Sequence, residues 1–560
     1  MAPATSPDHP RNGLLAGRFA VLALAAALLP AAGAAPAVAE PEPAGVVVDR
    51  QREAFDAAFD EAFERYRLPG LAVGIVVDGE VVYRRTRGER EAGDGRAIDP
   101  ATLFRIASLS KAMTAALLAR LVDQGRLRWD DPVVKYLPHF RMHDDWVSGQ
   151  IQVRDLLIHN SGLGPGAGDL MLWPEPNLFT REDVIRGLRH LKPLHSFRSR
   201  YAYDNNLYIV AGEVAAAAGG APFDALVRRE IFAPLGLDRC QVGAWQRDAV
   251  GNLAQPHMRQ AGVDIVIQAD GETIPDVPMM AAGGIRCSLD DMLLWARVWL
   301  EPERFGVDGE GRPWLSEAQR EALWHTHMPM PLSRQMREWD NSHFSAYGYG
   351  WRLTDVDGTW KVSHTGTLSG MYSHLVLLPE KKAGIVFMAN GGNSEARTVL
   401  PQVLLKMFTR ADAAAAPTVA YYADWLAAQA SASAGQAPGQ PAPQGAAEPR
   451  APAVAGDPQL IPGTYRDPWF GAVSICPRAG GFEFVAEKSP LLAGRVMRAG
   501  DRLLVDWHAE EVDAEAWLDF RPAASGQPAT LTMAKVDPEA DFSYDYEDLA
   551  FERTEGCPAP

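Results

Sequence analysis

The sequence predicts an α/β (α+β) domain followed by a small β-barrel, and three observations lead to this fold class. The N-terminal half of the chain contains a helix, a hairpin and a buried helix in succession. Apart from Tyr421 to Leu426, the stretch 412–457 is rich in Ala, Pro, Gln and Gly and has the composition of a linker. Beyond it, short strand-like runs alternate with turn residues over 458–560, as in a small up-and-down barrel. We therefore expect one domain over 40–411 and a second over 458–560.

Hydrophobic periodicity justifies the elements of the first domain. Phenylalanines recur every four residues from Phe55 to Phe63, a spacing that predicts an amphipathic helix. Two apolar runs, 71–77 and 81–84, flank an Asp-Gly pair that favours the positive φ angles of a tight hairpin turn. The segment 113–124 is apolar nearly all round, so we expect a buried central helix there.

Length and charge limit the classes of function. A chain of 560 residues is too long for one ordinary core, in agreement with two domains. The formal net charge of −17 and the lack of any Lys/Arg-rich block argue against nucleic acid or an anionic membrane as a partner. No metal-ligand spacing, phosphate loop or nucleotide fingerprint occurs, so we expect no metal and no organic cofactor. A small molecule or a peptide is the expected substrate.

The first 39 residues have the three regions of a secretory signal peptide. Arg11 and Arg18 precede an apolar segment over 19–29, and small residues follow up to an A-x-A cleavage site at 37–39. A membrane anchor is the alternative, but the unbroken apolar segment is shorter than the ~20 residues that a span needs. We expect a periplasmic or secreted protein without a stable membrane span after cleavage.

The four cysteines allow several pairings. Export permits disulfides, and we expect Cys476–Cys557 within the barrel and Cys240–Cys287 within the first domain. Closing a barrel brings its first and last strands together, which favours the pairing of Cys476 with Cys557. For Cys240 and Cys287, two free buried thiols are the alternative.

Ser108 and Lys111 form an S-x-x-K motif at the start of the buried helix. If the chain turns helical at Ser108, Lys111 lies one turn further along the same face, with its amine near the Ser108 hydroxyl. A serine hydroxyl needs a base to become a nucleophile, and a desolvated lysine can lose its proton and act as that base. The free N–H groups of the helix N-terminus favour negative charge at Ser108. For the motif alone, an N-cap serine followed by an exposed lysine is the alternative.

Two further segments carry polar residues suited to the same chemistry. Tyr203 and Asn205 open a helix two residues apart, where a phenol can relay a proton and an amide can orient a substrate. His364 lies at a predicted strand edge and can donate to a substrate carboxylate. In the run Thr365-Gly366-Thr367 that follows it, a backbone N–H near Thr367 can pair with that of Ser108 as an oxyanion hole. Taken singly, each segment also fits a structural role.

Together these segments resemble the serine β-lactamase / D,D-peptidase superfamily, in particular its class C-like branch of penicillin-binding-protein-related esterases and peptidases. The resemblance covers about 47–409 and rests on matches in the family's order: Phe104 to Lys111, Leu156 to Leu163, Tyr203-Asp204-Asn205 with Tyr208, Ala282-Gly283-Gly284, Tyr347 to Trp351 and His364-Thr365-Gly366. It implies an antiparallel sheet flanked by terminal helices on one side, with an all-α insertion on the other and the cleft between them.

The resemblance also implies roles for the residues. Ser108 is the acylated nucleophile, and Lys111 and Tyr203 share the general-base and proton-shuttle work. Asn205 positions the substrate, while Ser108 and Thr367 supply the oxyanion-hole N–H groups. The implied activity is the hydrolysis of an ester or a peptide bond, as in D-aminopeptidases and esterases.

His364 departs from the β-lactamase pattern, in which lysine usually opens the third motif. Histidine is mostly neutral at pH 7, so a permanent cation for a β-lactam carboxylate is missing, and Asp204 adds a negative charge where serine is frequent. Efficient β-lactam hydrolysis is therefore disfavoured. The alternatives are a β-lactamase or D-alanyl-D-alanine carboxypeptidase, and a non-catalytic penicillin-recognising sensor, against which the intact motifs argue.

The C-terminal region resembles the lipocalin-like domain that accompanies some hydrolases of this superfamily. The matching residues are Pro462 to Tyr465, Phe542 to Tyr544 and Asp548 to Phe551. Such a barrel can cap the cleft, mediate the contacts of a homo-oligomer, or remain a passive tethered module, and the sequence leaves these roles open.

Overall fold

The computed structural model describes residues 44–392, 394–410, 416–435, 449–478, 480–524 and 526–557. The expected signal peptide over 1–39 lies outside the described residues, as does 436–448 of the expected linker. By its internal contacts, the chain from Val48 onward forms one unit, which includes both the first domain and the barrel.

An eight-stranded antiparallel sheet organises the first domain, with strand order β2-β1-β14-β13-β12-β11-β10-β9. The hairpin predicted at its start is confirmed, because β1 and β2 are joined by Asp78 and Gly79, both with positive φ. The strands are β1 (Gly70–Val77), β2 (Glu80–Gly88), β9 (Met328–Pro329), β10 (Ser345–Tyr347), β11 (Arg352–Val356), β12 (Thr359–Leu368), β13 (Met371–Leu378) and β14 (Ala383–Ala389).

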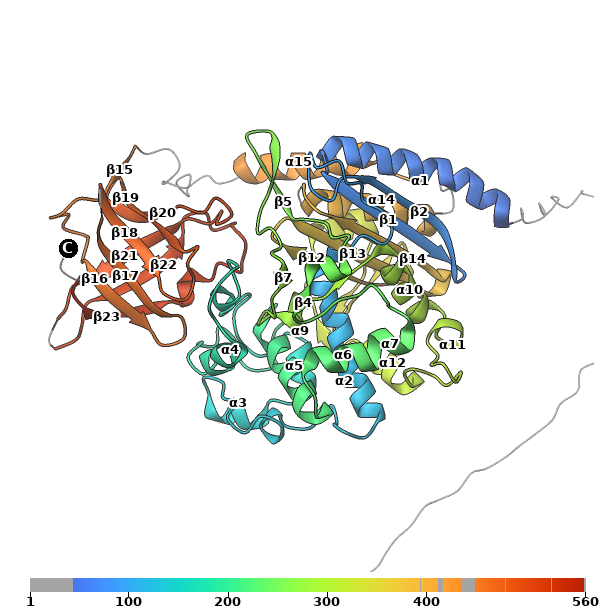
Figure 1. Ribbon diagram of the computed structural model, residues 1–560, viewed down its shortest axis with the longest axis horizontal. Helices are drawn as coiled ribbons and strands as arrows, with labels where there is room; N and C mark the ends of the chain where they lie inside the picture. Colours follow the sequence, from blue (N-terminus) through green and yellow to red (C-terminus); the bar gives the residue numbers. More distant parts are fainter. Residues whose placement is uncertain are drawn as a thin grey trace, which may run out of the picture. The chain divides into compact units, whose positions relative to one another are not determined.

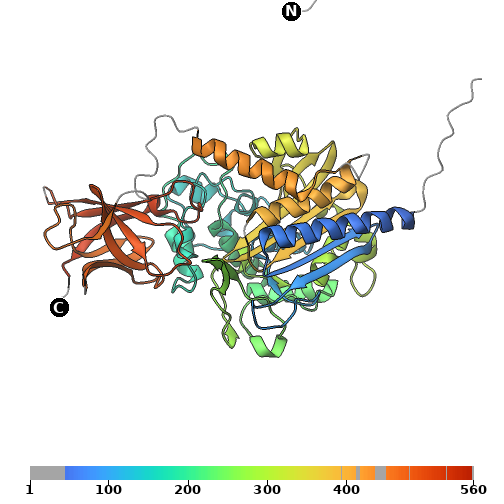
Figure 2. The same ribbon diagram turned by 90° about the horizontal axis from the view of Figure 1, so that it is seen from above.

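Helices cover both faces of this sheet. On one face lie α1 (Ala44–Tyr66), α14 (Ser394–Thr409) and α15 (Val419–Gly435), which run side by side in Figures 1 and 2. The other face packs on α10 (Leu289–Leu300), whose buried residues share one apolar cluster with those of α2 (Ser110–Asp123). Strand β1 serves both layers: Leu71 joins the apolar cluster of Phe55 on α1, and Ala72 joins the cluster of α2 and α10.

The all-α insertion is confirmed between Val133 and Leu235, a fully described stretch without strands. Its longest helix, α5, packs on α2 and so fixes the nucleophile helix from the side opposite the sheet. The elements are η2 (Val133–Lys135), α3 (Asp145–Gln150), η3 (Val153–Leu157), η4 (Asp169–Met171), α4 (Arg181–Gly187), α5 (Asn206–Gly219), α6 (Phe223–Val227), η5 (Arg228–Phe232) and α7 (Ala233–Leu235).

Short elements connect the insertion to the sheet. They are β3 (Phe104–Arg105), η1 (Ala107–Leu109), β4 (Trp245–Gln246), α8 (Arg247–Val250), β5 (His257–Gln260), β6 (Val263–Val266), β7 (Thr273–Ile274), α9 (Met280–Gly283), β8 (Arg286–Cys287), α11 (Pro302–Phe305), α12 (Glu317–Leu323), α13 (Arg334–Asp340) and η6 (Pro379–Lys381). No single helix in the described part of the chain is both long and apolar enough to cross a membrane.

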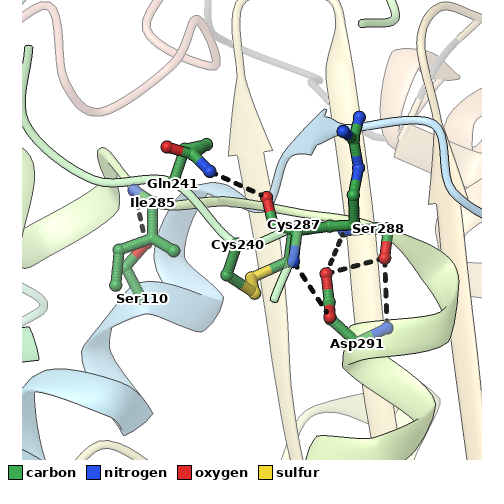
Figure 3. Close-up of a disulfide and its surroundings, with 8 residues drawn as sticks. Ser110, Cys240, Gln241, Ile285, Cys287, Ser288 and Asp291 are labelled. Carbon is green, nitrogen blue, oxygen red and sulfur yellow. Dashed lines mark hydrogen bonds between the residues drawn. A yellow bond between two sulfur atoms is a disulfide. The ribbon is translucent and has the colours of Figure 1, made fainter. Parts of the chain in front are cut away.

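The Cys240–Cys287 disulfide ties the segment after the insertion to the strand that supports the nucleophile helix (Figure 3). Two residues before Cys287, the Ile285 N–H donates to Ser110 Oγ at 3.2 Å, in the first turn of α2. On the other side, Ser288 caps α10 by accepting the Asp291 N–H at 3.1 Å. The bond therefore joins three elements around the start of α2, and the alternative of two free thiols is excluded.

The C-terminal barrel is closed and its strands follow one another in sequence. Each strand from β16 to β23 pairs with its neighbours, β16 pairs with β23, and β15 adds to the edge at β19. The Cys476–Cys557 disulfide links β17 to the chain after β23, as expected. The elements are β15 (Arg450–Pro452), β16 (Gly463–Asp467), β17 (Gly471–Arg478), β18 (Gly481–Ala486), β19 (Ala493–Ala499), β20 (Arg502–Trp507), β21 (Ala516–Arg521), β22 (Thr530–Lys535), η8 (Tyr546–Asp548) and β23 (Ala550–Glu555).

The range 412–457, expected to be a linker, contains structure at both ends. Helix α15 buries Tyr422 against Trp339, with ring centroids 4.5 Å apart, and so belongs to the first domain. Strand β15 lies within the same range and belongs to the barrel. Composition indicated a linker because an alanine-rich helix with a single charged residue, Asp424, lacks a strong periodic signal.

Replacing Cys476 and Cys557 together by alanine should destabilise the barrel by about 2–4 kcal/mol, because their disulfide closes a long loop of the unfolded chain. A urea titration followed by tryptophan fluorescence measures this as a lower midpoint. Ser474→Ala, two residues away on β17, is the matched control and should unfold like the parent. An unchanged midpoint in the double variant would contradict the prediction.

Candidate active site

Ser108 lies in a strained turn at the entrance to α2. The preceding residue, Ala107, has φ 48°, a left-handed conformation that residues other than glycine seldom adopt. Ser108 itself is half-buried and lines a cavity of about 830 Å³. The predicted helical turn is present as the short helix η1 followed by α2, so Lys111 lies on the same face as Ser108.

The Lys111 ammonium group is fully buried and makes three hydrogen bonds. Its Nζ lies 3.0 Å from Ser108 Oγ, 2.8 Å from Asn205 Oδ1 and 2.9 Å from the carbonyl oxygen of Ala282. The carbonyl comes from α9, the run that begins with the Ala-Ala-Gly-Gly segment noted in the sequence. The three acceptors fix the amine beside the serine hydroxyl.

Burial lowers the pKa of Lys111 from 10.5 to about 7, and the nearby charge of Arg352 acts in the same direction. The carboxylates of Asp169 and Asp204 oppose this fall. Near neutral pH, a large fraction of Lys111 is therefore the uncharged amine, which has a free lone pair. A neutral amine at 3.0 Å can accept the proton of Ser108 Oγ, which is the task of a general base.

Asn205 connects Lys111 to a buried carboxylate that the sequence did not reveal. Its Oδ1 accepts from Lys111 Nζ, and its Nδ2 donates to Asp169 Oδ2 at 2.8 Å. Asp169 is fully buried, and burial raises its pKa well above the usual range. Asn205 lines the cavity, and each end of its amide makes one hydrogen bond within the protein, so the expectation that Asn205 positions the substrate stays a prediction.

Tyr203 lies on the other side of the lysine. Lys111 Nζ is 4.9 Å from the centroid of the Tyr203 ring, and the Tyr203 hydroxyl interacts with that of Ser108. Burial raises the pKa of Tyr203 to about 12, although the charge of Arg352 and the Ser108 hydroxyl oppose this rise. The phenol therefore keeps its proton at neutral pH, which favours Lys111 as base and Tyr203 as proton donor.

Strand β12 presents alternate residues to the cavity. Thr365 and Thr367 line it, whereas His364 and Gly366 face away, as the period of two along a strand requires. Gly366 is needed because the strand passes close to the turn that holds Ser108: an added Cβ would lie 2.4 Å from the Ile106 carbonyl oxygen. The close approach brings Thr367 to the cavity wall beside Ser108.

His364 does not reach the cavity, contrary to the expectation that it donates to a substrate carboxylate. It is only 1% exposed, its Nε2 lies 2.8 Å from the Tyr347 hydroxyl, and its Nδ1 lies 2.8 Å from the Thr365 carbonyl oxygen. Burial lowers the pKa of His364 well below its usual range, so the ring is neutral. It supports the strand and the aromatic wall around Tyr203.

The cavity contains two arginines. They supply the permanent positive charge for a substrate carboxylate that was expected to be missing because His364 replaces a lysine. Arg352 and Arg397 both line the cavity. Arg352 donates to Thr365 Oγ1 at 2.7 Å, and Arg397 donates to Thr367 Oγ1. Burial lowers the pKa of Arg397 to about 10, so it stays charged at neutral pH. Both side chains are held by the threonines of β12 that face the cavity.

The site residues that were not predicted from the sequence all lie outside the recognised motifs. Asp169 and Arg397 stand outside the quoted segments, and Arg352 directly follows one of them, Tyr347 to Trp351. No motif spacing therefore pointed to these three residues. A buried charged residue of this kind can be recognised only from the residues that it contacts in the folded structure. In the part of the chain that the structure describes, no group of three or more His, Cys, Asp or Glu side chains could hold a metal ion.

Gly366→Ala should slow the reaction of Ser108 at least tenfold, because the new methyl group meets the Ile106 carbonyl oxygen and Ser373 Oγ and pushes β12 away from the nucleophile turn. The measurement is the rate of covalent labelling by a fluorophosphonate, followed by intact-protein mass. Gly149→Ala is the control, since a Cβ there meets nothing within 4 Å. Equal labelling rates for parent and Gly366→Ala would refute this role of the glycine.

Residues 55–406 match the family model described as Beta-lactamase. Among curated relatives, the esterase EstB of Burkholderia gladioli is 36% identical over 196 residues, which cover 33% of this chain and 50% of the esterase. The unguisins hydrolase of Aspergillus violaceofuscus is 26% identical over 357 residues. That match covers 60% of each chain, so this chain spans less than two thirds of that relative's length.

A solved structure shows the same fold over most of the chain. The octameric penicillin-binding protein homologue from Pyrococcus abyssi aligns with a TM-score of 0.55 and 18% identity, covering 86% of this chain and 97% of that one. The resemblance inferred from the ordered motifs is thereby confirmed at the level of family and fold. Because the family model spans more than half of its residues, the chain belongs to the Beta-lactamase family.

Proposed function

We propose that this protein is an exported serine hydrolase that cleaves an ester or a peptide bond through an acyl-enzyme at Ser108, in the manner of D-aminopeptidases and esterases. The observation that carries the proposal is the buried Lys111 amine, 3.0 Å from Ser108 Oγ, with its pKa lowered to about 7. A lysine in that state is costly to bury and unsuited to a surface role, but it is matched to general-base catalysis near neutral pH.

In the first half of the reaction, neutral Lys111 takes the Ser108 proton as Oγ forms a bond to the substrate carbonyl carbon. The negative charge that develops on the carbonyl oxygen is stabilised by the backbone N–H groups of Ser108 and Thr367. As the tetrahedral intermediate collapses, the bond to the leaving alcohol or amine breaks. Tyr203, which keeps its proton at neutral pH, donates to the leaving group and recovers a proton from the Lys111 ammonium.

In the second half, a water molecule attacks the acyl carbon of the ester formed at Ser108. Lys111, neutral again after passing its proton on through Tyr203, accepts a proton from that water. The bond between the acyl carbon and Ser108 Oγ breaks, Oγ regains a proton, and the carboxylic acid leaves. Asn205 stays bound to Lys111 through both steps, which keeps the amine aligned with Oγ.

Short esters and short peptides, including those with D-residues, are the proposed substrates. The relative that is an esterase supports the ester. The second candidate is a D-alanyl-D-alanine carboxypeptidase, supported by Arg352 and Arg397, whose charges in the cavity suit a substrate carboxylate. The same arginines weaken the earlier argument against β-lactams, so a β-lactamase stays among the alternatives. A non-catalytic sensor is opposed by the complete set of Ser108, Lys111 and Tyr203.

Export to a periplasm or to the medium is part of the proposal. It is supported by the three regions of a signal peptide in the first 39 residues. Two disulfides, with no free cysteine among the described residues, are typical of proteins in an oxidising compartment. The octameric homologue from Pyrococcus abyssi supports a homo-oligomer for this chain as well.

Turnover by the mature protein should be fastest on a short-chain p-nitrophenyl ester or a D-alanyl p-nitroanilide and should vanish in Ser108→Ala. A chromogenic cephalosporin should be cleaved slowly, and a peptide ending in D-alanyl-D-alanine tests the second candidate. Ser431→Ala, an exposed serine on α15, is the control and should turn over like the parent. A fast cephalosporin reaction would replace the proposal by a β-lactamase, and ester turnover that survives in Ser108→Ala would refute it.

A further inference from the structure

We propose that a segment of the barrel, residues 541–545, is a working part of the active site, in which Ser543 and Asp545 position Asp169 and, through Asn205, the Lys111 amine. The segment connects β22 to η8 and β23 and is called the barrel segment below. The inference rests on the proposed function only in taking Ser108 and Lys111 as nucleophile and base. It assigns the barrel a role that the family match over 55–406 does not include.

The barrel segment contacts the short helix η4 through three hydrogen bonds. Ser543 Oγ donates to Asp169 Oδ2 at 2.9 Å. The Asp545 carboxylate accepts the N–H of Gly168 at 2.5 Å and the N–H of Leu170 at 3.1 Å, on either side of Asp169. Asp169 is thus fixed by its side chain and by both neighbouring peptide groups from a segment almost four hundred residues away in sequence.

The backbone before η4 is shaped to receive this segment. Gly166 has φ +71°, and a Cβ added there would lie 2.6 Å from the carbonyl oxygen of Phe542. The Gly166 N–H donates to the Tyr203 carbonyl oxygen at 2.9 Å, so the same turn is also tied to the Tyr203 loop. The Phe542 ring packs edge-on to the Tyr203 ring, with centroids 5.9 Å apart.

Both oxygens of the Asp545 carboxylate accept hydrogen bonds from the first domain. Asp545 is 6% exposed, and the partners found for it are the two N–H groups next to Asp169, both outside the barrel. Burial raises the pKa of Asp545 well above its usual range, and the nearby Asp169 carboxylate adds to that rise. A passive tethered barrel has no need of such an arrangement, because buried charges are costly to desolvate.

A continuous chain of hydrogen bonds runs from the barrel segment to the base. Ser543 donates to Asp169 Oδ2, which also accepts from Asn205 Nδ2, while Asn205 Oδ1 accepts from Lys111 Nζ. Because Asn205 Nδ2 donates to Asp169 Oδ2, the other end of the amide, its oxygen, is turned toward the lysine. The side chains also line one cavity, since residues 541–544 border the same space as Ser108.

Loss of the Ser543 hydroxyl should lower the pKa of Lys111. The hydroxyl stabilises the ionised form of Asp169, whose charge in turn favours the protonated form of Lys111. Without it, Asp169 carries less charge and Lys111 becomes a weaker base that is neutral at lower pH. Asp204 and Arg352, which also act on the pKa of Lys111, stay in place in the variant, as do the neutral rings around the amine, those of Tyr203, Tyr208, His159 and His364.

The test is the pH dependence of Ser108 labelling by a fluorophosphonate, measured on the full chain for parent and Ser543→Ala. In Ser543→Ala the rate at the high-pH plateau should fall about tenfold, and the midpoint of the ascending limb should move to lower pH. Ser543→Thr, which keeps a hydroxyl, should restore both toward the parent. Asp545→Asn tests the same segment independently and should also slow labelling.

Lys488→Gln is the control that weakens the contact between the barrel and the first domain without touching Asp169. It removes an ion pair of 2.7 Å between the barrel and Asp183 on α4, away from Asp169, and should leave plateau and midpoint unchanged. A parental plateau and midpoint in Ser543→Ala would overturn the inference, as would equal slowing in Lys488→Gln. If the parent itself is not labelled at Ser108, the proposed function fails instead, so the two failures are distinct.

Discussion

The desolvation of the Lys111 amine is the constraint on which the rest of the structure depends. A fall in pKa from 10.5 to about 7 means that the site disfavours the protonated amine, relative to water, by roughly 5 kcal/mol. The protein achieves this by surrounding the head group with α2, α5 and α9 and by offering it three neutral oxygen acceptors. Neutral acceptors satisfy the hydrogen bonds of the amine without supplying the charge that would fix its proton.

The surrounding elements follow from the need to hold Ser108 against this amine. The nucleophile turn is strained at Ala107, and two glycine-containing segments pack directly on it: β12 at Gly366 and α9 at Gly283. The Cys240–Cys287 disulfide and the Ser288 cap fix the strand that follows α9 (Figure 3). Strain of this kind persists where several elements over-determine the geometry, and here they do so at the nucleophile.

The sequence revealed those parts of the site that local spacing determines. Ser108 and Lys111 lie three apart at a helix start, and Tyr203 and Asn205 two apart before α5, so each pair could be placed before any tertiary contact was known. His364 was misjudged because the face that a strand residue presents depends on the pairing of β12 with its neighbours, which no local pattern determines. The hairpin and the short strands of the barrel were predicted from local patterns, whereas the all-α insertion was implied by the family resemblance, and all three are present.

What could not be predicted depends on contacts between distant segments. Asp169 is recognisable only once Asn205 and Ser543 are seen to share its carboxylate. Likewise α15 has the composition of a linker, yet it is helical because Tyr422 is buried against Trp339. In α15, tertiary burial overrides the local composition. For Asp169, which belongs to no motif, only its buried contacts indicate a role.

The central claim is that Lys111 is a neutral amine under working conditions. Its most direct test is an NMR titration of protein labelled with ε-¹³C lysine, with the Lys111 signal assigned by Lys111→Arg. The account predicts that this one signal titrates near pH 7 while the exposed lysines titrate near their usual 10.4. A Lys111 signal that titrates with the exposed lysines would contradict the account, because the amine would then be protonated when Ser108 reacts.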